Sequence, residues 1–476
     1  MALSKLSKSE LIEIILDQQE LILTLQSRLS ELEEKVLSLE RSTKRQAAPF
    51  GRREDEKVSK RKKSGRKGGH QGYYRMVPDQ VDEFKAVPLS SICPYCSGSI
   101  SEIQPLDQWI EELPEIRPKV IHLRTYQGRC EGCQRVVRSH HPSQLGHSQG
   151  AAKVQLGRRA SGFVLALQHQ FGLSKRKVSR FLSQYMGLSL TPGGVIHLNH
   201  RLAKKLTLDY DQLMAQARQS AYIHSDETSW YVGGPKHWLW VFTNQHLTLY
   251  QVADSRGRKV IQQILGDHYP GVLISDCLNI YDTVNPLQHK CYSHHLKELS
   301  RLRELAGKDP PSRFWRKARQ VFHLAMQLKK QQTRMNPARI KRIRSLLEAQ
   351  ADLLFLPLRD EHLEEKFAFR IRKQREHLFT FLDFTQVDPT NNLAERQLRP
   401  AVIARKISCG NRTPKGANTW KIIASIATTA DQLKQDFIHT VDLAITRHLN
   451  IVRADEARFG IGPVPLNNFD LLEYGR

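Results

Sequence analysis

The sequence predicts a multidomain α/β protein, and three observations lead to that prediction. At 476 residues the chain is long enough for several domains with sizeable hydrophobic cores. A leucine-rich helical pattern, a strongly basic stretch and two C-x-x-C pairs occupy its first third. From residue 221 the pattern changes to short apolar strands interspersed with helical segments. We therefore expect small N-terminal modules followed by a mixed α/β domain.

The first predicted module is a leucine-rich coiled-coil helix over residues 9–40. Its apolar residues recur at heptad spacing, and only Gln18 interrupts the series. They are Leu11, Ile15, Ile22, Leu25, Leu29, Leu32, Val36 and Leu39. Mainly β-branched residues at a and leucines at d favour a parallel dimer, so we expect a homodimer or higher oligomer through this helix. Docking on the protein's own body is the alternative, because further leucines widen the stripe.

Residues 41–76 are predicted to be a basic disordered linker. Residues 41–75 carry thirteen Lys/Arg and three Asp/Glu, a net charge of +10, and few apolar residues. The whole chain has a net charge of +25, which favours a polyanionic partner, with nucleic acid first and an acidic membrane surface second. A soluble spacer is the alternative for this segment.

The cellular compartment follows from two absences in the sequence. No apolar run approaches the ~18 residues needed to span a bilayer. The N-terminus has no apolar signal-peptide region or cleavage site. We expect a cytoplasmic, nucleoid-associated protein without a membrane partner. Its seven cysteines are then expected to be metal ligands and core thiols rather than disulfides.

A zinc-binding ribbon is predicted over residues 85–145. Two C-x-x-C turns supply the four thiolates that tetrahedral zinc needs, namely Cys93, Cys96, Cys130 and Cys133. The 33 residues between the pairs exceed the usual finger spacing and contain a strand-like stretch, 120–126, which favours a ribbon. We expect one structural Zn²⁺ without a role in chemistry. Two metal-free, reduced knuckles are the alternative.

Residues 155–206 are predicted to be a helix-turn-helix-like DNA-binding region of three helices. Gly187 ends one helix, and Thr191-Pro192 provides an N-cap and a first-turn proline for the next. Both helices are basic; the second carries His197, His200, Arg201, Lys204 and Lys205. Plain scaffolding is the alternative to DNA contact.

Residues 218–446 are predicted to be a catalytic domain with a ribonuclease-H-like fold. The pattern gives a strand at 221–224, a hairpin of 238–243 with 247–252, a short helix at 260–265 and an apolar strand at 271–275. That order of elements is typical of the opening of such a fold. A charged helical insertion is expected at about 296–385, a closing helical region at 420–445 and a C-terminal tail at 447–476.

Three carboxylates of this domain are the candidate site. Asp226 and Asp276 each follow a predicted strand, where side chains of open α/β sheets project into a ligand cleft. Glu395 lies on a later predicted helix among asparagines and arginines. Together they predict a site for two Mg²⁺ (or Mn²⁺) ions about 3.5–4 Å apart. Taken singly, an aspartate after a strand is more often a turn former or a helix cap than a metal ligand, and a glutamate on a basic helix more often pairs with an arginine. Glu227 is left out, because it faces the other way if its strand continues.

The run N-N-L-A-E-R-Q-L-R-P at 391–400, followed by Arg405-Lys406, resembles the signature of bacterial DDE transposases of the insertion-sequence 66 family. Cys291-Tyr292-Ser293-His294 is similar to the C-x-x-H element of that family, and residues 113–133 and 9–40 resemble its zinc-binding segment and leucine-rich helix. The basic residues 61–72 depart from the family linker by lacking proline, and the stretch 408–416 is atypical.

The resemblance implies roles for named residues. Asp226, Asp276 and Glu395 would be the catalytic triad that binds two divalent ions. Asn392, Arg396 and Arg399 would position the helix or contact phosphate. His294 would orient substrate or a metal-bound water, and a helix-capping histidine in a core is the alternative.

The resemblance also implies an activity and partners. The expected function is binding of the terminal inverted repeats of an insertion sequence, hydrolysis at its ends and transfer of the 3′-hydroxyl to target DNA. Double-stranded DNA is the expected partner, and accessory proteins encoded by the element are further candidates. A non-catalytic DNA-binding regulator or a decayed transposase is the alternative, and a generic ribonuclease-H-like nuclease is a third.

Overall fold

A computed structural model describes residues 28, 32, 36, 75–139, 141, 144, 154–282, 284–285, 287–307 and 312–458, the last nine of these by backbone alone. The three described positions of the predicted coiled coil are helical; the rest of that segment and most of the linker lie outside the described residues. The chain divides into two units, residues 1–113 and 114–476. The division falls inside the predicted ribbon. In the described part of the chain, no helix has the length and apolarity to span a bilayer.

The two C-x-x-C turns lie in different units. In the first, an isolated bridge joins Ile92 to Ser99 around the first pair of cysteines. In the second, β1 (Gln127–Arg129) and β2 (Val136–Arg138) form an antiparallel hairpin around the second pair. The prediction of a strand at 120–126 was wrong, because those residues have no strand partner and β1 begins only at Gln127.

Three helices lie within residues 155–206, as predicted, and a fourth follows them. They are α2 (Arg158–His169), α3 (Lys175–Tyr185), α4 (Pro192–Lys205) and α5 (Thr207–Gln219). The capping signals lie where they were expected: the hydroxyl of Thr191 accepts from the amide of Gly194 at 3.0 Å, and Gly187 after α3 has a φ of +61°. Helix α5 lies outside the predicted region 155–206 and starts directly after α4.

A five-stranded mixed sheet forms the centre of the second unit, in the order β5-β4-β3-β6-β7. Strands β3, β4 and β5 pair antiparallel, whereas β6 and β7 run parallel to β3. Their bounds are β3 (Tyr222–Tyr231), β4 (Lys236–Thr243), β5 (Thr248–Ala253), β6 (Val272–Ser275) and β7 (Gln288–Lys290). Helix α6 (Arg258–Leu265) connects β5 to β6. The predicted hairpin, short helix and apolar strand are confirmed to within two residues.

The predicted helical insertion comprises four long helices. These are α7 (Tyr292–Ala306), α8 (Arg313–Gln331), α9 (Pro337–Phe355) and α10 (His362–Lys373). Their apolar faces share one core with Tyr222, Val272 and Ile274 of the sheet. Trp315 is 3% exposed in that core, so its role is packing.

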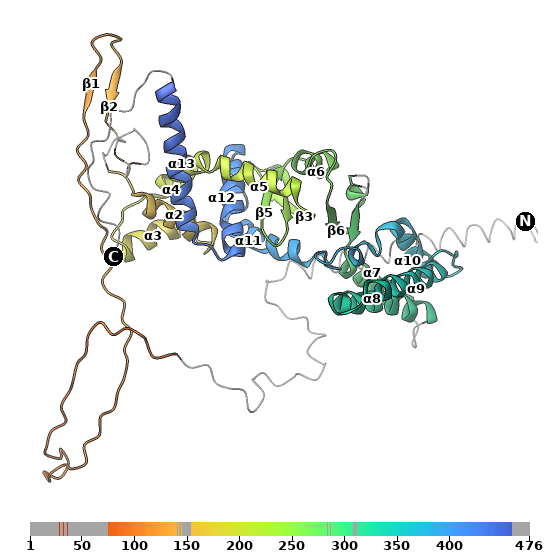
Figure 1. Cartoon of the computed structure of the whole chain (residues 1–476), viewed down its shortest axis with the longest axis horizontal. Coiled ribbons are helices and arrows are strands. Elements are labelled where there is room, and N and C mark those ends of the chain that lie inside the picture. The colour runs from red at the N-terminus through yellow and green to blue at the C-terminus, as the bar shows by residue number, and fades with distance from the viewer. Residues whose placement is uncertain are drawn as a thin grey trace, which may run out of the picture. The chain divides into compact units, whose positions relative to one another are not determined.

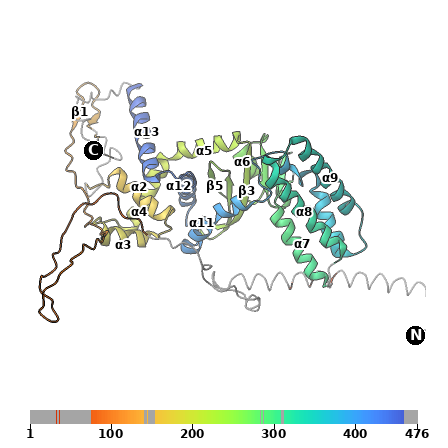
Figure 2. The same cartoon turned by 60° about the horizontal axis from the view of Figure 1, so that its bottom comes forward.

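The chain returns to the sheet through α11 (Asn392–Ser408), α12 (Pro414–Leu433) and α13 (Phe437–Arg458). Helix α12 lies along β5, and hydroxyls of α12 accept from amides of that edge strand: Ser425 from Tyr250 at 2.9 Å and Thr429 from Thr248 at 3.0 Å. The helix thus satisfies backbone groups that an open sheet edge would leave unpaired. Figures 1 and 2 show α12 with α2–α4 and α13 on the β5 side, and α7–α10 on the β6 side.

Candidate active site

Of the two predicted catalytic aspartates, Asp226 lies in β3 and Asp276 comes directly after the adjacent strand β6. Strand β3 pairs with β6 in parallel, with His224 opposite Ile274, so Asp226 and Asp276 occupy equivalent positions two residues further on. Side chains two residues apart in a strand share a face, which directs both carboxylates to the same side of the sheet. One oxygen of each is fixed by a nearby amide: Glu227 donates to Asp226 and Leu278 donates to Asp276, both at 2.9 Å.

The sequence predicts that the strand ends before Asp226, and this prediction was wrong. Asp226 pairs with Val241 inside the β3–β4 ladder, which continues to Tyr231. The following residue, Glu227, therefore points to the opposite face, as expected. There it accepts from Arg256 at 2.6 Å and from the hydroxyl of Tyr281 at 2.7 Å, so its negative charge is paired with the Arg256 guanidinium.

Helix α11 lies across the face that Asp226 shares. Its buried residues Ala394, Leu398 and Ala401 pack against Trp230 and Val241, together with other residues of β3 and β4. Glu395 follows Ala394 in the first turn, which brings the third carboxylate to the same side of the sheet as the two aspartates.

The start of α11 is tied to β3 by Asn391, which is fully buried. Its amide group donates to the carbonyl of Ser225 at 2.8 Å, and its oxygen lies 3.0 Å from Nδ1 of His224. The backbone amide of Glu395 in turn donates to the carbonyl of Asn391 at 3.2 Å. Burial lowers the pKa of His224 to about 4, so this ring is neutral and the tie carries no charge.

The C-x-x-H element, residues 291–294, contacts the segment that leads into α11. The thiol of Cys291, at the N-terminus of α7, accepts from the amide of Asn391 at 3.0 Å, and the amide of Tyr292 donates to the carbonyl of Pro389 at 2.9 Å. His294, in the first turn of α7, feels the charges of Asp276 and Glu395, but burial outweighs them and lowers its pKa. Of the two adjacent histidines, His295 is the one packed in the core, stacked on Phe322.

The carboxylates of the site repel one another, because few positive charges compensate them. Burial, and then the neighbouring carboxylates of Glu227, Asp276 and Glu395, raise the pKa of Asp226 from 3.8 to about 8. Oε1 of Glu395 is buried without a hydrogen-bond partner, and its ion-pair partner Lys297 lies 4.0 Å away. Nδ1 of His294 is also buried and unpartnered.

These groups have the donor chemistry of a divalent-cation site, since carboxylate oxygens are the ligands that magnesium prefers. Among the residues that the structure describes, no three His, Cys, Asp or Glu side chains form a group that could hold a metal ion as they stand.

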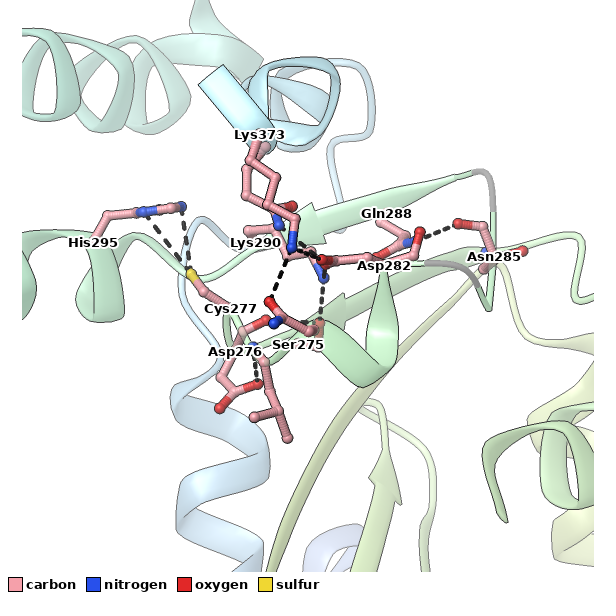
Figure 3. Close-up of polar contacts among 12 residues, drawn as sticks. Ser275, Asp276, Cys277, Asp282, Asn285, Gln288, Lys290, His295 and Lys373 are labelled. Carbon is pink, nitrogen blue, oxygen red and sulfur yellow. Dashed lines mark hydrogen bonds and ion pairs between the residues drawn. The ribbon is translucent and has the colours of Figure 1, made fainter. Parts of the chain in front are cut away.

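A buried lysine lies behind Asp276, at the ends of β6 and β7 (Figure 3). Lys290 is fully buried, and its ammonium is 3.2 Å from Asp282 and 3.5 Å from the hydroxyl of Ser275. Lys373 of α10 reaches the other oxygen of Asp282 at 3.1 Å. Burial lowers the pKa of Lys290, and the charges of Asp282 and Asp276 oppose that shift.

The remaining predicted residues of α11 face solvent. Asn392, Arg396 and Arg399 are all exposed, which leaves them available to a partner. The buried asparagine that fixes the helix is Asn391 instead. Sequence reasoning missed this role, although the first asparagine of the N-N pair was visible, because nothing in the sequence says which of two adjacent amides turns inward. It also missed Lys290, whose short polar strand β7 gave no apolar signal, and its partner Asp282, which follows a short 3-10 helix.

The two C-x-x-C knuckles have the same local geometry. In each, the amide four residues after the first cysteine donates to that cysteine's carbonyl at 2.9 Å, and Ser97 and Gln134 both have a φ of +60°. Amide donors lower the pKa of the first thiol in both: those of Tyr95 and Cys96 for Cys93, and chiefly that of Cys133 for Cys130. A thiol that ionises readily suits metal ligation.

Comparison with known proteins supplies the last observation. The family described as "Transposase IS66 family" matches residues 153–419, more than half of the chain. The match contains the three carboxylates, the C-x-x-H element and the helices α2–α5. No curated protein matches the chain. A family match over this share of the sequence, with the mixed sheet and its carboxylates on one face, shows that the chain belongs to the IS66 family of transposases.

Proposed function

We propose that this protein is a metal-dependent DNA transposase that binds the terminal inverted repeats of its element, cleaves the DNA there and transfers the strands to a target. The observation that carries the proposal is the equivalent position of Asp226 and Asp276 along the parallel strands β3 and β6, with Asp276 directly after β6, under the helix that bears Glu395. The order β5-β4-β3-β6-β7, with β4 antiparallel to β3, supports a ribonuclease-H-like assignment for residues 218–446.

In this proposal Asp226, Asp276 and Glu395 hold two Mg²⁺ or Mn²⁺ ions. Bound there, such ions would activate a water or a 3′-hydroxyl and stabilise the departing oxygen. The raised pKa of Asp226 supports the assignment, because carboxylates that repel one another are stabilised by a cation between them. Asn391 and Cys291 act as positioning residues, since they fix the start of α11 against β3 and α7.

In this proposal the exposed residues of α11 contact the phosphates of the DNA substrate. Arg396 and Arg399 present guanidinium groups that suit phosphate oxygens. Asn392 is exposed beside them and adds a neutral donor. In this proposal His294 orients substrate; the charges of Asp276 and Glu395 acting on its ring and its buried, unpartnered Nδ1 support that role.

Three further parts of the proposal concern the modules that precede the catalytic domain. One structural Zn²⁺ is held by Cys93, Cys96, Cys130 and Cys133, supported by the matching geometry of the two knuckles. Residues 9–40 associate two or more copies, supported by their heptad pattern. The helices α2–α4 contribute to DNA binding.

The test is cleavage of a duplex that carries the element's terminal repeat, in Mg²⁺ buffer. Asp226→Asn, Asp276→Asn and Glu395→Gln should each abolish cleavage and keep DNA binding, and Glu227→Gln, on the other face of the sheet, should keep both activities if it folds. Retained cleavage in any of the three variants would sink the catalytic assignment. Binding without cleavage by the unaltered protein would instead favour a DNA-binding regulator or a decayed transposase.

A further inference from the structure

A second concave site lies away from the carboxylates, between α4 and α12. It is a cavity of about 460 Å³ whose walls come from α4, the first residue of α5 and the first turns of α12. Its polar lining residues are His197, His200, Arg201, Lys204, Thr207, Lys415, Asn418 and Thr419. The lining contains three cationic side chains and two histidines, and no carboxylate.

The cavity carries positive charge that the described residues do not neutralise. In the described part of the chain, neither Arg201, Lys204 nor Lys415 forms an ion pair, and all three are exposed. The first turn of α12 contains no acidic residue that would offset its positive helix end. Cations also gather beside the cavity: burial and the charge of Arg412 lower the pKa of Lys175, and burial and the charge of Lys415 lower that of His200.

The cavity is held in shape by contacts to the sheet. The loop between α11 and α12 docks on the end of β3, where Asn411 exchanges backbone hydrogen bonds with Tyr231 and Gly233, both at 2.9 Å. The side chain of Asn411 accepts from the indole of Trp230 at 2.8 Å. Across the cavity, Nδ1 of His200 lies 2.7 Å from the hydroxyl of Thr419. The start of α12 is therefore fixed relative to both β3 and α4.

We propose that this cavity binds a phosphate group of DNA. Guanidinium, ammonium, amide and hydroxyl donors around a rigid concave surface suit a phosphate oxygen, and the lack of any carboxylate removes the competing charge. The assignment to DNA rests on the proposed function, because a transposase must hold DNA outside its reaction centre. In this proposal the atypical stretch 408–416 positions α12 for phosphate binding.

The test compares two charge-matched double variants of the full chain. Arg201→Gln/Lys415→Gln removes two cations from the cavity, and Lys341→Gln/Arg342→Gln removes two exposed cations from α9. Affinity for a 30-bp duplex is measured by fluorescence anisotropy across a salt series, with and without 5′-phosphates on the duplex. The cavity variant should bind about tenfold or more weaker, with a salt slope reduced by about one to two, whereas the α9 variant should change affinity less than about twofold.

The duplex pair separates two sources of the phosphate. An equal loss on both duplexes identifies an internal phosphodiester, and a loss confined to the 5′-phosphorylated duplex identifies a terminal phosphate; either supports the proposal. Equal affinities and slopes for the two double variants would overturn it. If the unaltered protein cleaves with Mg²⁺ but the cavity variant binds normally, only this inference fails. If the cavity variant binds weakly but no protein cleaves, only the catalytic proposal fails.

Discussion

Replacing the central aspartate of the proposed site should make the metal-free protein more stable at alkaline pH. Asp226 is surrounded by the carboxylates of Glu227, Asp276 and Glu395, and burial and these charges raise its pKa from 3.8 to about 8. An asparagine side chain is an uncharged isostere of the protonated acid. The Asp226→Asn variant therefore removes a charge that the folded protein accommodates poorly, at the expense of the proposed metal site.

The size and pH window follow from linkage. The folded protein holds the Asp226 proton more tightly than the unfolded chain, so the stability it contributes is complete below pH 3.8 and is lost as pH rises to about 8. The rise in the pKa of Asp226 from 3.8 to about 8 corresponds to at most about 6 kcal/mol, since each tenfold change in proton affinity is worth about 1.4 kcal/mol. Because Asp226 is only partly buried and its surroundings relax, we expect about half, roughly 3 kcal/mol.

Urea unfolding in EDTA, followed by tryptophan fluorescence, measures this difference. Trp230 and Trp240 are fully buried in the sheet beside the site, so their emission reports on its unfolding. The free energy of unfolding of Asp226→Asn should match the unaltered protein at pH 4 and exceed it by roughly 3 kcal/mol at pH 9. Asp254→Asn, an exposed control, should show no such trend. A difference that stays constant from pH 4 to pH 9 would refute the reasoning.

Three other predictions concern the frame around the site. Asp282→Asn should lower the free energy of unfolding by about 3 kcal/mol in urea, because it leaves the fully buried Lys290 without its carboxylate; Lys373→Met, at a side chain 46% exposed, should cost less than about 1 kcal/mol, and equal losses would contradict this. Gly410→Ala should cost roughly 2 kcal/mol, because the residue has a φ of +92° and an added Cβ would collide with the carbonyl of Tyr231; an unchanged melting temperature would count against that loop geometry. Elemental analysis should find about one zinc per chain, lost in Cys133→Ser, and a folded, zinc-free protein would overturn the ribbon.

The parts of the fold that follow a simple pattern were predictable from the sequence. The β4–β5 hairpin and β6 combine apolar residues with a short polar turn, and the caps at Thr191 and Gly187 act within one turn of the chain. The candidate carboxylates could be proposed for the same reason, since each follows or begins a recognisable element. Their shared face became visible only with the register of β3 against β6.

The remaining features depend on contacts between distant segments. Strand β3 continues past Asp226 because its second half pairs with β4 and packs on α11, which the local sequence does not reveal. Strand β7 is polar yet buried because its polar groups have partners. Asp282 compensates the charge of Lys290, and the side-chain amide of Gln288 donates to the backbone carbonyl of Asn285. The choice of Asn391 over Asn392 as the buried amide likewise depends on a carbonyl of β3.

Binding of Mn²⁺ to the full chain, measured by isothermal titration calorimetry in the presence of terminal-repeat DNA, tests the convergence of the three carboxylates most directly. The unaltered protein should bind about two ions per chain. Asp226→Asn, Asp276→Asn and Glu395→Gln should each lose at least one of them, whereas the neighbouring Glu227→Gln should keep both. Isotherms that none of the three substitutions alters would contradict a metal site formed by these side chains.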